Sequence, residues 1–213
     1  RIVKESFAIG LAPFLMNFVA CFIVIAINKS LKIYGGDLSI GAYGIVNRIV
    51  FVFIMVVMGL TQGMQPIVGY NYGARQIDRV FETLKKTILY ATVVMTFGFA
   101  VCMLFPRTVV SIFTTDAELL QKSADGLRLI VAMFPLVASS IVIGNFFQSI
   151  GKPKRSIFLS LSRQLLFLLP CLWILPEFYD IDGVWYSFIV SDFMATCVAY
   201  MILYLFIKKY RKT

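Results

Sequence analysis

Six apolar stretches, each long enough to cross a lipid bilayer, follow one another along the 213 residues of this chain. Four of them carry no charged residue and two carry one charge each. The stretches are 6–28, 49–74, 87–106, 129–151, 156–176 and 183–207. A helix needs about 20 residues to cross the hydrocarbon core. Within that core, backbone amides must be hydrogen-bonded inside a helix or a closed barrel. We therefore expect a polytopic membrane protein.

Composition agrees with this interpretation, since 60% of the residues are hydrophobic and only 15% are charged. We predict an all-α membrane protein, a single unit over residues 1–213 that forms a bundle of six transmembrane helices. The predicted spans are approximately 6–28, 43–71, 87–106, 123–150, 156–176 and 183–207. The chain opens on Arg1 without a Met, so we expect it to be a fragment of a longer protein.

The positive charge gathers at alternate junctions between the spans. Of the 20 basic residues, 13 lie in four clusters. These are Arg1/Lys4, Arg75/Arg79/Lys85/Lys86, Lys152/Lys154/Arg155 and Lys208/Lys209/Arg211/Lys212. Basic residues favour the cytoplasmic side of membrane proteins, so both ends of the chain and two loops are predicted to be cytoplasmic. The net charge of +9 thus reports topology and contact with lipid headgroups, and we expect no nucleic-acid partner.

Catalytic and metal-binding residue types are scarce. The chain has no histidine, which removes imidazole bases and the commonest metal ligand. Its cysteines lie singly in different apolar runs, without the spacing of a zinc site or a disulfide framework. We therefore predict no catalytic residues, no metal site, no cofactor and no enzymatic activity. A channel or a purely structural membrane protein stays open, although no sustained polar stripe marks a pore.

Prolines are predicted to break three of the spans: Pro13, Pro66 and Pro135. A proline inside a helix removes one backbone hydrogen bond and bends the helix. Broken spans are typical of transporters, in which the freed backbone groups line a cavity. A kink without a role in transport is the alternative.

The junctions carry local helix signals. Residues 74–86 read as a charged connector that runs into the third span, with Glu82 and Lys86 at helical pairing distance. Thr115 and Glu118 have the spacing of a capping box and predict a helix start. Before them, residues 107–113 predict a short amphipathic helix along the membrane surface.

Amides at membrane depth are the candidates for a substrate pathway. They are Asn17, Gln62, Gln65, Asn145 and Gln148. An amphipathic cation needs apolar and aromatic contacts with a few polar groups that orient it. The alternative is that these amides only bond between helices and rigidify the bundle. Asn47 and Arg48 are expected at the outer entry of the second span.

Three motifs resemble the multidrug and toxin extrusion (MATE) family. They are Gly63-Met-Gln-Pro-Ile-Val-Gly-Tyr-Asn-Tyr-Gly-Ala74, Ile112-Phe-Thr-Thr-Asp-Ala-Glu118 and Phe147-Gln-Ser-Ile-Gly-Lys-Pro-Lys154. Their order and spacing match the second half of such a transporter across essentially the whole chain. The resemblance implies twelve helices in two lobes, of which this chain would be the C-terminal one. It also implies a bacterial cytoplasmic membrane protein that exports cationic or amphipathic drugs in exchange for Na⁺ or H⁺. Its partners would be the drugs, the lipid bilayer and the missing N-terminal lobe.

The chain departs from that family at two positions. Some members carry acids in the first and fourth spans of this lobe that help to bind the coupling ion. The corresponding positions here fall near Cys21 and Ser139. Cation coupling would then use Asp192 or reside in the missing N-terminal lobe, and the resemblance favours the second.

Arg163 and Asp192 are the charges deep in the last two spans, and we expect them to interact. By the helical rise they lie at levels that differ by roughly 6 Å in a core of about 30 Å. An intramembrane charge is costly and is a candidate for function. The alternative is that Arg163 extends to the headgroups and Asp192 joins a local amide network.

We predict a secondary multidrug efflux transporter, with a lipid or oligosaccharide-lipid flippase of the same superfamily as the alternative. A flippase would favour a strongly cationic cavity, whereas only Arg163 lies deep in this chain.

Overall fold

The computed structural model describes the backbone of residues 2–210 and the side chains of residues 18–208. Every regular element in that part of the chain is a helix, so the predicted all-α fold is confirmed. In chain order the elements are α1 (Ile2–Gly73), α2 (Ile77–Leu104), α3 (Pro106–Ser111), α4 (Ala117–Val131), α5 (Phe134–Ser149), α6 (Pro153–Leu161), the π-helix η1 (Ser162–Leu168) and α7 (Leu169–Tyr210).

Helix α1 is a hairpin of two limbs, residues 2–35 and 37–73, that meet at Gly36. Gly36 has φ 70° and ψ −176°, which only glycine adopts without steric cost. The preceding Gly35 allows close packing, because a Cβ there would lie 2.5 Å from a methyl carbon of Ile181. The helix therefore continues through residues 29–35 and reverses at the single residue Gly36. The predicted spans 6–28 and 43–71 had left a longer junction between them.

Helix α7 reverses in the same way at Asp180, with φ 48° and ψ −129°. The two limbs of α7, residues 169–179 and 181–210, approach closely just after the reversal. A Cβ on Gly183 would lie 2.4 Å from the carbonyl oxygen of Leu175, so this position requires glycine. The short junction that the predicted spans 156–176 and 183–207 leave at residues 177–182 is thus a hairpin with almost no loop.

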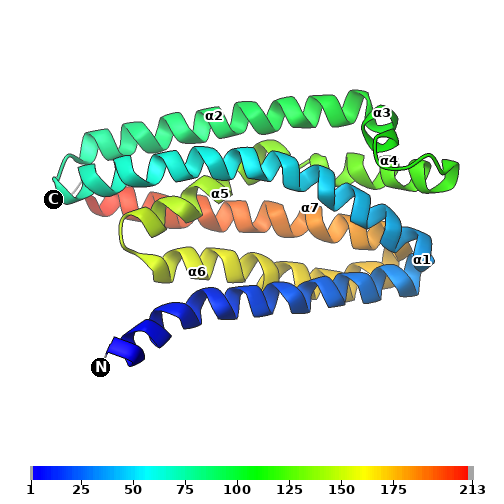
Figure 1. Ribbon diagram of the computed structural model, residues 1–213, viewed down its shortest axis with the longest axis horizontal. Coiled ribbons are helices and arrows are strands. Elements are labelled where there is room, and N and C mark those ends of the chain that lie inside the picture. Colours follow the sequence, from blue (N-terminus) through cyan, green and yellow to red (C-terminus); the bar gives the residue numbers. More distant parts are fainter. Residues whose placement is uncertain (1, 211–213) are drawn as a thin grey trace.

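The long helical segments run along one axis of the bundle (Figure 1). Among the described residues, three helical stretches and one bent pair are apolar and long enough to cross a membrane. The reversals at Gly36 and Asp180 divide two of these stretches into antiparallel limbs. The turns at 74–76 and 150–152 and the last turn of α7 lie together at one end, which we call the basic end (Figure 1). The reversals within α1 and α7 and helix α3 lie at the other end, which we call the hairpin end (Figure 1).

The predicted span 123–150 is two helices rather than one. α4 and α5 are bent by 57° at a break of two residues. Pro135 lies in the first turn of α5, where a missing N–H is tolerated. The predicted break at Pro135 is therefore present.

The predicted cap of α4 is wrong by one residue. Asp116, and not Thr115, caps the helix, with its Oδ1 accepting from Leu119 N at 2.8 Å. A carboxylate at this position also interacts favourably with the helix dipole. The short helix expected over 107–113 is observed as α3, and the Glu82–Lys86 pair is confirmed at 2.7 Å.

The other two predicted breaks have different outcomes. Pro66 lies within the second limb of α1, whose backbone stays helical through it, so the predicted break there is wrong. Three residues further on, a Cβ on Gly69 would contact the Ser149 carbonyl oxygen at 3.5 Å, so α1 and α5 pack closely at this level. Pro13 lies outside the residues whose side chains are described.

Aromatic rings fill the core at the basic end. We call Phe146, Phe147 and Phe206 the aromatic layer, since their centroids lie 5.5–5.9 Å apart in edge-to-face arrangements. All three side chains are buried. Such pairs add about 0.5–1.5 kcal/mol beyond the burial of their area. The layer joins α5 to the end of α7.

Candidate functional site

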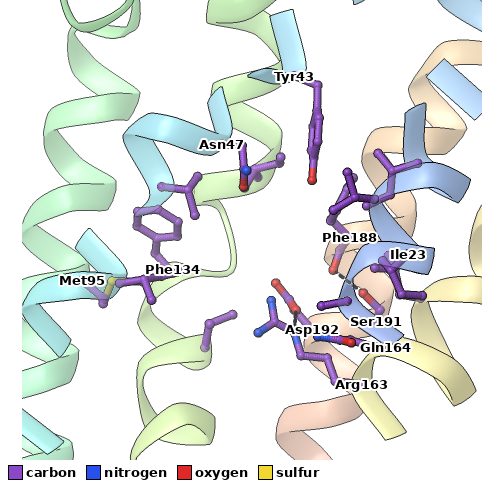
Figure 2. A pocket seen from close by; sticks show the side chains of 18 residues that line it. Ile23, Tyr43, Asn47, Met95, Phe134, Arg163, Gln164, Phe188, Ser191 and Asp192 are labelled. Carbon is purple, nitrogen blue, oxygen red and sulfur yellow. Dashed lines mark hydrogen bonds and ion pairs between the residues drawn. The ribbon is translucent and has the colours of Figure 1, made fainter. Parts of the chain in front are cut away.

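A chamber of about 260 Å³ lies within the bundle, with both limbs of α1 in its wall. η1, α7, α2, α4 and α5 complete the wall (Figure 2). The wall is mainly apolar. Its apolar residues are Ala20, Ile23, Val24, Ile27, Val50, Ile54, Met95, Ile130, Phe134, Val137, Leu168 and Phe188. Its polar residues are Tyr43, Asn47, Arg163, Gln164, Ser191 and Asp192.

An ion pair forms one side of this chamber. Arg163 Nε lies 2.7 Å from Asp192 Oδ1, so the structure brings together the two charges that the sequence places deep in the last two spans. The side chain of Asp192 is 10% exposed and that of Arg163 is 38% exposed. The Asp192 side chain is thus buried, while that of Arg163 is partly exposed. Removing one partner of such a pair leaves an uncompensated charge and costs about 3–5 kcal/mol.

The π-helix η1 orients Arg163. Its wider turn is shown by the Leu169 N–H, which donates to the Gln164 carbonyl five residues earlier. Arg163 and Gln164 are sequence neighbours, yet both line the chamber. Single π-turns within α-helices are frequent at functional sites. The local widening therefore gives the chamber two adjacent polar side chains.

Tyr43 and Asn47 project into the chamber from the second limb of α1 (Figure 2). They are four residues apart and so share one helix face. The ring of Tyr43 stacks on Phe188 at 5.7 Å and lies 6.3 Å from the ring of Trp185. These contacts position the Tyr43 hydroxyl, which can both donate and accept a hydrogen bond.

Two of the predicted pathway amides meet elsewhere in the bundle. Gln65 Nε2 donates to Asn145 Oδ1 at 3.4 Å, between α1 and α5. Asn145 Nδ2 in turn donates to the Ile141 carbonyl at 3.0 Å. This is the interhelical bonding that the sequence left as the alternative to a pathway role.

The remaining amides lie apart from the ion pair. Gln62 and Gln148 are exposed, and neither they nor Gln65 and Asn145 line the chamber. Asn17 lies outside the residues whose side chains are described. The predicted site residues therefore divide into a charged pair in the chamber and amides nearer the basic end.

Sequence reasoning did not assign Tyr43 and Gln164 to a site and placed Asn47 at an outer entry. Tyr43 and Asn47 carry a usable signal, because two polar residues at i and i+4 in a mainly apolar helix mark one face. Gln164 carries no such signal, since only the π-turn directs it toward the chamber. Among the residues with described side chains, no three His, Cys, Asp or Glu groups lie close enough to share a metal ion.

Comparison with known proteins finds one family of membrane transporters. The sequence model of the MatE family matches residues 11–174. Multidrug export protein MepA of Staphylococcus aureus is 26% identical over 209 residues, which are 96% of this chain and 45% of that protein. The MepA protein of Staphylococcus haemolyticus is 23% identical over 202 residues, 95% of this chain and 44% of that protein. The chain thus spans less than half the length of these relatives.

Solved structures agree with the fold. The MATE multidrug transporter DinF-BH superposes with a TM-score of 0.80 at 39% identity, over 95% of this chain and 46% of that one. An outward-facing multidrug resistance MATE family transporter of the MOP superfamily superposes with a TM-score of 0.89 at 21% identity, over 100% of this chain and 48% of that one. The bundle therefore has the fold of one lobe of such a structure.

Proposed function

This chain belongs to the MatE family, and on that premise we propose that it is the C-terminal half of a multidrug efflux transporter. The transporter would export cationic or amphipathic compounds across a bacterial cytoplasmic membrane in exchange for Na⁺ or H⁺. The missing N-terminal lobe would complete the substrate pathway. We further propose that the basic end faces the cytoplasm, as the clustered Lys and Arg residues favour.

The chamber and its ion pair are the observation that carries this proposal. Ionisable side chains within a membrane are rare and are usually found on substrate or ion pathways. Apolar and aromatic walls with a few converging polar groups suit an amphipathic ligand. At about 260 Å³ the chamber is smaller than most drug sites. It would therefore hold one moiety of a drug, with the rest in contact with the other lobe.

The geometry of Asp192 bears on ion coupling. A guanidinium already lies 2.7 Å from its carboxylate, so Na⁺ would have to displace Arg163 to bind there. This supports a coupling site in the missing N-terminal lobe. We propose that Arg163 and Asp192 hold η1 against α7 and give the chamber its polarity.

The same geometry supports drug export over the flippase alternative. A pyrophosphate-bearing lipid needs several uncompensated cations. Among the chamber residues only Arg163 is cationic, and Asp192 neutralises it.

Ethidium efflux from vesicles containing the full-length protein tests the proposal. We expect efflux to depend on a Na⁺ or H⁺ gradient applied separately. Asp192→Asn should lower the rate at equal protein content while preserving the gradient requirement, if the coupling site lies in the other lobe. Absence of drug efflux under either gradient would reject the export proposal. Loss of the gradient requirement in Asp192→Asn would move coupling to Asp192.

Orientation has its own test. Single cysteines at Lys154 and at Asp180, in a cysteine-free background, should differ in labelling by an impermeant reagent. We expect only the cysteine at Asp180 to react from outside, because the start of α6 and the reversal within α7 lie at opposite ends of the bundle (Figure 1). Labelling of both cysteines from outside would contradict this predicted orientation.

A further inference from the structure

A second cavity lies on the outside of the bundle at the basic end. It is a groove of about 620 Å³ between the first turns of α2 and the last turns of α7. Both elements reach the same end of the molecule (Figure 1). Phe81 and Phe206 meet edge to face at 6.5 Å and hold the two helices together beside it. The groove is far larger than one water molecule.

The lining of the groove changes character along α2. Asp78 lies at the aqueous start of the helix, and Lys85 follows two turns later. Ile88 comes next, in the run of residues 87–106 that carries no charge. Tyr200 and Ile207 line the facing side on α7. From water toward the membrane, the groove therefore presents a negative group, a positive group and then apolar surface.

The two charges lie on one face of α2 without pairing to each other. Seven residues correspond to about two helical turns and about 10 Å of rise. Helical side chains lean toward the N-terminus, so the lysine stem brings its ammonium back toward the level of Asp78. Among the described residues, neither side chain forms an ion pair or a hydrogen bond, whereas the adjacent Glu82 and Lys86 pair at 2.7 Å. The opposite charges in the groove are thus available to a ligand.

We propose that the groove binds a phosphatidylethanolamine molecule from the leaflet at the basic end. The order of groups in this lipid, from water inward, is ammonium, phosphate and acyl chains. It complements Asp78, Lys85 and the apolar surface at Ile88 and Tyr200. The primary ammonium donates hydrogen bonds to the Asp78 carboxylate, and Lys85 binds the phosphate as a point charge.

Other phospholipids match only part of this pattern. A choline headgroup has no N–H to donate to Asp78. A glycerol headgroup has no cation and places a net negative charge near the same carboxylate. Charge alone would favour an anionic lipid at this basic end, so the groove's preference for ethanolamine rests on Asp78. This site depends on the chain lying in a membrane and is independent of drug export.

Native mass spectrometry of the full-length protein, titrated with ethanolamine, choline and glycerol phospholipids of identical acyl chains, tests the proposal. We expect the ethanolamine lipid to bind about tenfold more tightly than the choline lipid, the effect of one charge-assisted hydrogen bond. Asp78→Asn should remove this preference. Lys85→Gln should weaken all three lipids, because they share the phosphate.

The same helix offers matched controls. Glu82→Gln changes the net charge as Asp78→Asn does, and Lys86→Gln changes it as Lys85→Gln does, but neither Glu82 nor Lys86 lines the groove. Both should retain the ethanolamine preference. Equal or tighter binding of the glycerol lipid to the unmodified protein would overturn the proposal. So would an Asp78→Asn variant indistinguishable from Glu82→Gln, or the absence of any retained lipid.

Discussion

The chamber and the aromatic layer accommodate positive charge in opposite ways. At the basic end, Lys152 Nζ lies 4.3 Å from the ring centroid of Phe206 and the Arg155 guanidinium lies 5.4 Å from that of Phe147. Arg155 is exposed, so its charge stays hydrated while the ring faces add attraction. In the chamber, the cation of Arg163 is compensated by a buried carboxylate. Arg155 therefore keeps its contact with water beside the rings, whereas Arg163 is stabilised by a buried carboxylate.

The two regions also differ in packing. The aromatic layer is closely packed, whereas the chamber keeps about 260 Å³ unfilled and is lined by six polar residues. Close packing is expected to serve stability and the unfilled chamber to serve transport. Variants in the two regions should separate these two properties.

Charge reversal in the chamber has the largest expected effect. Asp192→Arg places two cations together in a buried site and should remove most folded protein from the membrane, because even removing one partner costs about 3–5 kcal/mol. Adding Arg163→Asp should restore part of the folded protein. Fluorescence size-exclusion of the full-length protein measures this.

The exposed Asp37 provides the control for that experiment. It pairs with Lys32 at 3.6 Å at the hairpin end, and both side chains are largely exposed. Asp37→Arg should leave folded yield nearly unchanged. A double chamber variant that folds no better than the worse single variant would show that the pair does not stabilise the lobe.

Truncation of the aromatic layer comes next. Phe206→Ala should lower the free energy of unfolding by about 3–5 kcal/mol, since it empties a buried site among three rings. Transport per folded molecule should fall much less than stability. Thermal unfolding measures the first quantity and ethidium efflux the second. Phe97→Ala, at a 67% exposed position, should change neither by a comparable amount.

Substitution of the polar side chains that face the chamber should lower transport more than stability. Asn47→Ala and Tyr43→Phe should each change stability by about 1 kcal/mol or less, yet lower drug efflux because both groups face the chamber. Gln65→Ala should also lower efflux without loss of membrane expression, but less than Asn47→Ala. Efflux rates at matched expression test this order. A larger effect at Gln65 would place the pathway along the Gln65–Asn145 contact instead.

The smallest effect is expected at Arg155. Arg155→Gln removes an exposed cation from the faces of Phe147 and Phe206 and should cost about 0.5–1 kcal/mol. Efflux should be unchanged, since the residue lies at the end of the bundle away from the chamber. A clear loss of efflux with intact stability would assign this residue a role in transport.

Local patterns in the sequence predicted the helices well, because such patterns act over neighbouring residues. Uncharged runs marked the helical segments, and Pro135 marked the break before α5. The predictions that were wrong, a helix break at Pro66 and a cap at Thr115, also have local causes. Pro66 is accommodated within a continuous helix, and Asp116 displaced Thr115 as a cap because its carboxylate accepts the Leu119 N–H.

The candidate site was only partly predictable. Arg163 and Asp192 stood out because charges are rare in apolar runs, and the structure joins them. The π-turn that directs Gln164 inward leaves no periodic trace in the sequence. Gln65 and Asn145 were predicted as pathway amides, and their mutual hydrogen bond is the bonding between helices that the sequence left as the alternative; it depends on the packing of α1 against α5.

The sequence by itself determined that this chain is a helical membrane protein with its basic residues at alternate junctions, because hydropathy and charge depend on residue type and order alone. The chamber between the limbs of α1 and the groove between α2 and α7 were decided only by tertiary structure. Each depends on distances between residues far apart in the chain. Those distances are set by how whole helix faces pack, and no local pattern encodes them.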